Sequence, residues 1–251
     1  MTDSHVGASR SPRSGGRFAE LLKVQAKLAL REPYGILGGI GLPVLLLAVF
    51  GFIGQAVPGN VGDTGLTIID LWTPTILVIA FIVISTALPN TLVRDREIGW
   101  LRRVSTTPLH PILLLAAQLI IDLILASAAT LIIILGGALV FGAVLHVQFL
   151  PFVLSLLLAV AEIFAFGLML VALLPTQAIA STVSGVVFFV LMFLSGLWFQ
   201  PAQVGDPLAT IMYYSPSGAA VRALLNAVFN GSPSYAALLT MAVYTVLFSF
   251  I

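Results

Sequence analysis

The sequence predicts an all-α polytopic membrane protein with six transmembrane helices and an N-terminal amphipathic interfacial helix. Three observations support this fold class: the composition, a series of long apolar runs, and the lack of the alternating pattern that a transmembrane β-barrel needs. Of the 251 residues, 59% are apolar and only 8% are charged, against about 25% charged residues in a typical soluble domain. The mean hydropathy is +1.12. Together these values exclude a soluble enzyme or a soluble binding module.

Six apolar runs are candidates for membrane spans, because about 20 apolar residues cross the hydrocarbon core as a helix. The third run is longer than an upright span requires, so it tilts or extends beyond the membrane. The last run is short and ends on Phe250-Ile251 without a basic anchor. We therefore expect the full gene to continue for several residues, with an unusually short last helix as the alternative. The six runs are residues 36–56, 71–93, 112–145, 149–174, 178–199 and 235–251.

The region before the first run divides into a tail and a helix. Residues 1–16 are rich in Ser, Gly and Arg and predict a disordered cytoplasmic tail. In residues 17–32, apolar side chains such as Phe18 fall on one helical side, and cations such as Lys23 and Lys27 fall on the other. This two-sided pattern predicts an amphipathic helix lying in the membrane interface. Pro33 ends it, because proline disfavours helical geometry in the residue before it.

The positive charges predict the orientation of the chain. Six of the 11 Lys and Arg residues precede the first run, and four more lie between residues 94 and 103. The loop between the first two runs has none and carries Asp63 and Asp70 instead. The positive-inside rule then places the N-terminus in the cytoplasm and predicts a multi-pass protein of the cell (inner or plasma) membrane. Arg222 is the one basic residue left for the outside.

The segment after the second run, residues 94–108, is unusual for a loop that merely obeys the positive-inside rule. Such a loop would explain four arginines, but it would not explain Asp95, Glu97 or the large apolar Trp100. We interpret the segment as a short cytoplasmic helix of mixed charge with an apolar anchor, suited to docking on another protein. Its chemistry-bearing residues are Arg94, Asp95, Arg96, Glu97, Gly99, Trp100, Leu101, Arg102, Arg103 and Pro108.

This segment resembles the ABC-2 family of ATP-binding-cassette transporter permeases, which carry the pattern R-E-x-G-x-L-x-x-L/V-x-x-T-P-L after span two. Residues 96–109 match that pattern position by position. A second similar stretch runs from Leu194 to Pro201 and continues through Pro207, Tyr214-Ser215-Pro216 and Arg222. One departure is Gln200, which separates Phe199 from Pro201 where the family often joins an aromatic residue directly to proline. The resemblance covers nearly the whole chain and makes residues 33–251 an ABC-2 type transmembrane domain.

The resemblance implies roles for both stretches. Residues 94–108 would be the coupling region that lies in a groove of the nucleotide-binding subunit. Residues 200–234, too polar and proline-broken to span, would form short re-entrant helices that dip into the outer leaflet and cap the exit of the path. The outer gate would then include Ser195, Gly196, Pro201, Pro216 and Arg222.

The partners follow from what the sequence does not contain. It has no G-x-x-x-x-G-K-[ST] phosphate loop, so ATP and Mg would bind to separate ATPase (nucleotide-binding) subunits, and no cofactor is expected in this chain. The absence of Cys excludes disulfides, a thiol nucleophile and Cys-ligated metals. We expect no metal site and no nucleic-acid partner. A second permease chain, identical or different, would be needed to enclose a path through the membrane lipid.

Asp122 and Glu162 are the only acids deep within the predicted spans. An isolated carboxylate at mid-membrane costs about 2.5–3.5 kcal/mol on insertion scales. Each should therefore face the bundle interior or a wet cavity, with hydrogen-bond partners such as Gln118. Two roles remain open for these three residues: a polar spot on the substrate path, or contacts that hold helices together.

The most consistent function is the permease subunit of an ATP-driven ABC exporter, not itself an enzyme. Its apolar path favours a hydrophobic drug-like or lipid substrate, with a polysaccharide or lipid-linked glycan as the alternative. An intramembrane hydrolase is rejected because His110, on the inside, is out of reach of Ser195 at the outer end. A proton-coupled secondary carrier would use Asp122 and Glu162, but the inverted repeats that such carriers show are not visible.

Overall fold

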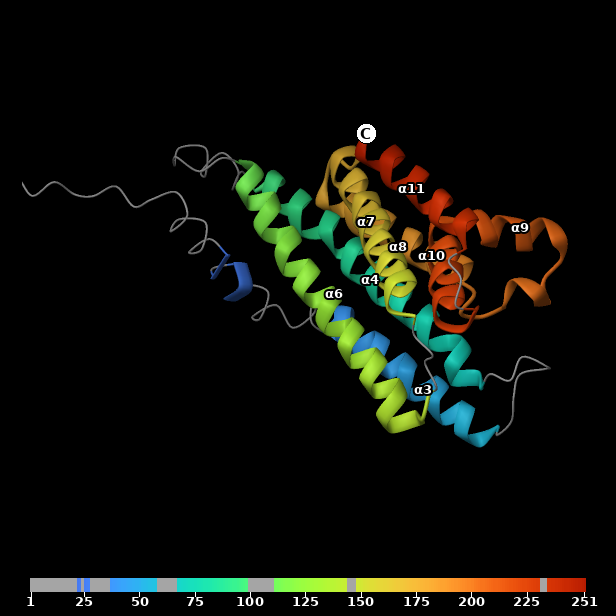
Figure 1. Cartoon of the computed structure of the whole chain (residues 1–251). Coiled ribbons are helices and arrows are strands. Elements are labelled where there is room, and N and C mark those ends of the chain that lie inside the picture. The colour runs from blue at the N-terminus through green and yellow to red at the C-terminus, as the bar shows by residue number, and fades with distance from the viewer. Residues whose placement is uncertain are drawn as a thin grey trace, which may run out of the picture.

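The computed structural model describes residues 22–23, 25–27, 37–57, 67–98, 111–143, 148–230 and 234–251. Within these ranges every regular element is a helix (Figure 1). Five helical segments are long and apolar enough to cross a membrane, and α11, at 15 residues, is shorter. This confirms an all-α multi-pass membrane protein. The elements are η1 (Leu37–Gly41), α3 (Leu42–Ala56), α4 (Ile68–Glu97), α6 (Pro111–Phe141), α7 (Phe149–Leu173), α8 (Gln177–Leu194), η3 (Pro201–Gln203), α9 (Asp206–Tyr214), α10 (Pro216–Leu225), η4 (Asn226–Asn230) and α11 (Tyr235–Ser249).

Helix α4 is the centre of the bundle. It packs against α3, α6, α7, α8 and α10, and 72% of its most apolar stretch is buried, against 39% or less for the other candidate spans. Its mid-section from Ile76 to Ile82 is fully enclosed. The core of the molecule therefore follows α4, and the neighbouring helices present their outer faces to the surroundings.

Helix α4 is longer than the predicted span of residues 71–93. Its 30 residues correspond to about 45 Å at a rise of about 1.5 Å per residue, about 15 Å more than the hydrocarbon core. At its start, the Thr67 hydroxyl and the Asp70 carboxylate form a reciprocal capping box. At its end, Arg94–Glu97 continue the helix without a break. The apolar run marked only the apolar part of this helix, because hydropathy does not detect polar turns that continue the same helix.

Helix α8 is shorter than the predicted span of residues 178–199 and ends at Leu194. The Ser195 hydroxyl donates to the Met192 carbonyl at 2.7 Å, and Gly196 has a φ of +84°. Glycine adopts this left-handed conformation without the steric penalty that a Cβ would add, so it commonly ends helices. The apolar residues Leu197–Phe199 therefore belong to the turn that leads to η3.

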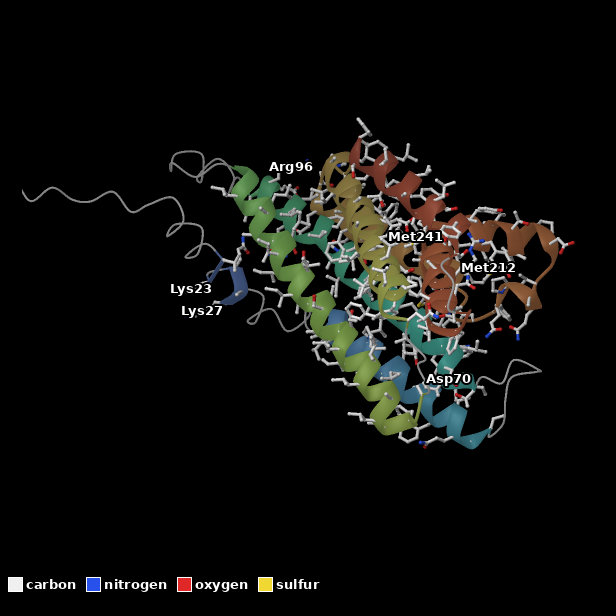
Figure 2. The ribbon with its side chains drawn as sticks, in the orientation of Figure 1. Lys23, Lys27, Asp70, Arg96, Met212 and Met241 are labelled. Carbon is white, nitrogen blue, oxygen red and sulfur yellow. The ribbon has the colours of Figure 1, made fainter. Side chains whose placement is uncertain are left out.

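The bundle has two ends, which Figure 2 identifies by Arg96 and Asp70 at opposite ends of α4. We call them the Arg96 end and the Asp70 end. Helix α11 runs beside α7 and finishes near the Arg96 end (Figure 1), where the Phe248 ring meets Phe166 of α7. Helices α9 and α10 follow α8 near the Asp70 end. Helix α10 is largely buried against α4, α7 and α11, whereas most of α9 is exposed.

Several predicted segments lie outside the described residues. Of the amphipathic helix predicted over residues 17–32, only residues 22–23 and 25–27 are described, and these are helical with Lys23 and Lys27 exposed. The predicted tail, residues 1–16, is not among them. The same holds for residues 99–110, which contain most of the predicted coupling segment.

Candidate functional site

The Arg96 end joins α4 to the turn between α7 and α8. The Arg96 guanidinium donates to the backbone carbonyls of Leu174 and Pro175. The Glu97 carboxylate accepts from the backbone N–H of Gln177 at 2.9 Å. Arg96 therefore binds the carbonyls that follow α7, and its neighbour Glu97 binds the N–H group at the start of α8.

A third contact extends this connection one turn into the bundle. The Ser181 hydroxyl of α8 donates to the Asn90 side-chain oxygen of α4 at 2.9 Å. The start of α8 is fixed by Thr176, whose hydroxyl accepts from the N–H of Ile179. Side-chain hydrogen bonds to charged groups are stronger than neutral ones, so a displacement of the last turn of α4 would move α8 with it. We call the contacts of Asn90, Arg96 and Glu97 with α8 and its preceding turn the α4–α8 link.

The predicted coupling residues divide between described and undescribed parts of the chain. Arg94 and Asp95 form an adjacent ion pair at 3.8 Å on the same last turn of α4. The prediction of a separate short helix starting at residue 94 is wrong for its first four residues, which continue α4. The remaining residues, Gly99, Trp100, Leu101, Arg102, Arg103 and Pro108, lie outside the described residues.

Asp122 and its predicted partner Gln118 lie one turn apart on α6. The Gln118 amide donates to both oxygens of the Asp122 carboxylate, each at 3.2 Å. Asp122 is 6% exposed and shares a helical face with the buried Ala126, Ala129 and Ile133. That face packs toward α4 and α3, so the carboxylate is inside the bundle and not on its lipid-facing side.

Glu162 of α7 is fully buried, and its carboxylate has no hydrogen-bond partner among the described residues. The direction in which Glu162 points follows from two contacts on the same face of α7, made by Ser155 and Phe166. Ser155 donates to the Ala223 carbonyl of α10 at 3.4 Å, and Phe166 meets Phe248 of α11. Glu162 lies between these positions and therefore faces the junction of α10 and α11. The interior thus holds an unpaired carboxyl group, which is costly in apolar surroundings.

The predicted outer gate residues come together at the Asp70 end, with Ser195 and Gly196 at the end of α8 and Pro201 starting η3. Ser215 separates α9 from α10, and its hydroxyl accepts from the Gly218 N–H at 3.1 Å. Pro216 occupies the first position of α10, where its missing N–H costs nothing. A Cβ on Gly218 would lie well under 3.0 Å from the Met212 carbonyl, so the α9–α10 corner depends on glycine at this position.

A cavity of about 360 Å³ opens at this end between α4, the end of α8, α9 and α10. Ser195, Gly196, Pro201 and Arg222 of the predicted gate line it, and Pro216 does not appear in its lining. Met212 of α9, which is labelled in Figure 2, is fully buried and forms one wall. The volume falls in the range of small-molecule sites, about 300–1,000 Å³.

The sequence did not indicate several residues of these sites. Residues 175–177 fell between two predicted spans, and Asn90 lay inside the second predicted span without a pattern that marked it. No sequence pattern marked Trp72, Thr75 or Tyr213 as residues of the cavity lining. Each belongs to an element that is distant in sequence from its partners, so no local pattern relates them. Within the described part of the chain, no group of three or more His, Asp or Glu side chains could hold a metal ion.

Comparison with known proteins identifies the family of the chain. The family model described as ABC-2 type transporter matches residues 17–229, which include the α4–α8 link, both buried carboxylates and the Asp70-end cavity. A search of curated protein sequences gives no match. The matched domain is the membrane-spanning permease component of an ABC transporter, whose family normally works with ATPase subunits. With a match over most of its length and a bundle of membrane-length helices, the chain belongs to the ABC-2 type transporter family.

Proposed function

We propose that this permease is the membrane subunit of an ATP-driven exporter whose nucleotide-binding subunits dock at the Arg96 end. Residues 94–108 would provide the docking segment, and ATP and Mg would bind to the partner subunits. The observation that carries this proposal is the α4–α8 link. It connects the start of the docking segment directly to the turn between two membrane-length helices.

The length of α4 supports transmission over this distance. A helix of 30 residues extends about 15 Å beyond a hydrocarbon core of about 30 Å. A force applied at its projecting end would reach α8 through Arg96 and Glu97, and α7 and α10 through buried side-chain packing. The same helix reaches the cavity at the Asp70 end through Leu71 and Trp72. A single continuous helix therefore joins the proposed docking end to the proposed exit.

The proposed topology has six crossings, with a cytoplasmic N-terminus and α11 as the last crossing. Supporting this, α11 runs beside α7 toward the Arg96 end (Figure 1). Helices α9 and α10 form the proposed outer re-entrant region, with α10 inserted into the bundle and α9 at its surface. Two such permease chains would enclose the path.

A hydrophobic drug-like or lipid substrate is favoured over a polysaccharide. The exposed faces of α3, α6 and α8 carry mainly large apolar side chains, including Phe52, Leu131 and Phe189. An interface between two copies built from such faces would offer few hydrogen-bond donors or acceptors to a long sugar chain. We propose export, out of the cytoplasm or the inner leaflet, as the direction of transport.

The proposal is tested by a Glu97→Lys, Trp100→Ala double variant, co-expressed with a candidate ATP-binding-cassette ATPase from the same genome. We expect normal membrane insertion, loss of the ATPase from the purified complex and loss of substrate-stimulated ATP hydrolysis. An Asp206→Lys variant is the matched control, because it reverses an exposed acid at the opposite end of the bundle. Wild-type co-purification and transport by the double variant would contradict the assignment.

A further inference from the structure

The described lining of the cavity at the Asp70 end contains one cation, Arg222, which is held between two tyrosine rings. The Arg222 guanidinium carbon lies 5.5 Å from the ring centres of both Tyr213 and Tyr214. These cation–π contacts orient the guanidinium. Two of its three nitrogens, Nε and one terminal nitrogen, are buried without a hydrogen-bond partner among the described residues.

No acid offsets this charge in the described lining of the cavity. Two acids lie on helices that border the cavity: Asp70, whose carboxylate caps α4 through Thr67, and Asp206, which is exposed at the start of α9. Neither lines the cavity. An uncompensated cation with free donors in a partly dry site favours an anion strongly, because desolvated charges interact more strongly than charges in water.

The walls around Arg222 limit what kind of anion fits. Leu71, Trp72, Leu194, Val221 and Leu225 make most of the lining apolar, and Thr75 and Gln200 add polar groups. Such a site suits an amphiphile whose anionic group meets the guanidinium while its apolar part lies along the wall. The guanidinium fork matches the oxygens of a phosphate group, which it can bind with two parallel hydrogen bonds.

We propose that this cavity binds the phosphate group of a membrane phospholipid headgroup through Arg222. The cavity lies at one end of the membrane-length bundle, beside the first turns of α4, where lipid headgroups are the most abundant phosphates. The proposal goes beyond the permease function, because it concerns binding and holds whether the lipid is cargo or a permanent component. It therefore stands or falls separately from ATPase docking at the other end.

The test measures lipid binding by the purified full-length permease in a neutral detergent, using native mass spectrometry during titration. The probes are phosphatidylglycerol, diacylglycerol with the same acyl chains, and inorganic phosphate. We expect phosphatidylglycerol to bind at least about tenfold more tightly than diacylglycerol, because only phosphatidylglycerol offers a charged phosphate to the guanidinium N–H groups. An Arg222→Gln variant should lose that preference.

A second pair of variants keeps the test decisive if Arg222→Gln folds poorly. Gln200→Glu places a negative charge in the cavity lining, and Gln203→Glu places the same charge three residues on, in exposed η3 outside that lining. We expect Gln200→Glu to weaken phosphatidylglycerol binding by about tenfold or more, and Gln203→Glu to bind like the wild type. Equal binding of both lipids, or equal effects of the two glutamates, would overturn the proposal. Inorganic phosphate binding as tightly as the lipid would overturn its lipid part.

Discussion

At the scale of single residues, Glu162 is the clearest departure from what stability alone would select. A buried carboxyl group without a partner costs about 1–3 kcal/mol relative to a satisfied or apolar side chain. Its neighbours Ala159 and Ile163 are buried and apolar, so the surroundings do not repay this cost. Such a group in a membrane helix is a candidate for function.

We predict that Glu162→Met makes the protein more stable but less active. Methionine has a similar volume and leaves no polar atom unsatisfied, so the melting temperature of the purified permease should rise. Transport should fall if the carboxyl group contacts substrate at the α10–α11 junction. Thermal unfolding and a transport assay on the same preparation measure both effects. Full transport by the stabilised variant would show that transport does not require the Glu162 carboxyl group.

Arg96 and Arg94 lie two residues apart but have different partners. Arg96 donates to two backbone carbonyls of the α7–α8 turn, whereas Arg94 pairs with its neighbour Asp95. We predict that Arg96→Ala destabilises the permease by about 1–2 kcal/mol, because these hydrogen bonds join different helices. Arg94→Ala should cost less, since an exposed ion pair contributes about 0–1 kcal/mol. Melting temperatures of the two variants compare them directly, and equal losses would contradict the α4–α8 link.

At the scale of elements, the contact between α4 and α7 depends on close approach of two backbones. A Cβ on Gly167 of α7 would lie under 3.0 Å from both the hydroxyl and the carbonyl oxygen of Ser85. The same Ser85 hydroxyl donates to the Ile163 carbonyl of α7 at 2.6 Å. Pro89, four residues on, cannot donate a helical hydrogen bond to the Ser85 carbonyl. The two helices therefore meet at the turn of α4 where Pro89 removes one backbone hydrogen bond.

We predict that Gly167→Ala destabilises the permease by about 1–3 kcal/mol, the usual cost of overpacking a tight interior. Gly185→Ala is the matched control, because it adds the same methyl group to α8 where nothing lies within 4 Å. The control should keep or slightly raise the melting temperature, since alanine favours helix more than glycine does. If the two variants unfold at the same temperature, the α4–α7 contact is looser than its geometry indicates.

At the scale of the whole molecule, the positive-inside charges and the direction of each helix lead to the same proposed orientation. Six basic residues precede α3, and α4 ends at the Arg96 end beside the α7–α8 turn. The Asp70 end carries α9 and the cavity, with Arg222 as its described cation. An odd number of crossings between residues 27 and 206 would place those two residues on opposite sides.

We predict that the two ends label from opposite sides of the membrane. The chain has no natural Cys, so single-cysteine variants report one position each. In intact cells an impermeant maleimide should label Asp206→Cys on exposed α9, and it should reach Lys27→Cys or Ser249→Cys only after the membrane is opened. Labelling of Ser249→Cys from outside would show that α11 does not complete a sixth crossing.

Much of the fold was predictable because long apolar helices are a property of contiguous residues. Hydropathy located α3, α6, α7 and α11 to within a few residues, and the gap between the runs that end at 174 and begin at 178 coincides with the turn between α7 and α8. It failed where a helix crosses the boundary of the lipid, as at Arg94–Glu97, and where a glycine turn interrupts an apolar run, as at Gly196. In both cases the helix ends at a different residue from the apolar run, so hydropathy alone misplaces the helix end.

The sequence by itself determined the class of the protein, the motif at residues 96–109 and the positions of Asp122 and Glu162 within spans. The tertiary structure decided which residues meet. It joined Arg96 to the α7–α8 turn and placed Arg222 against two tyrosines in a cavity with Trp72. It buried Glu162 at the junction of α10 and α11 without a hydrogen-bond partner in the described part of the chain. Each membrane span must be apolar by itself, so the composition of each segment is enough to identify it. Contacts between helices depend on packing across distant segments, so only the folded bundle shows them.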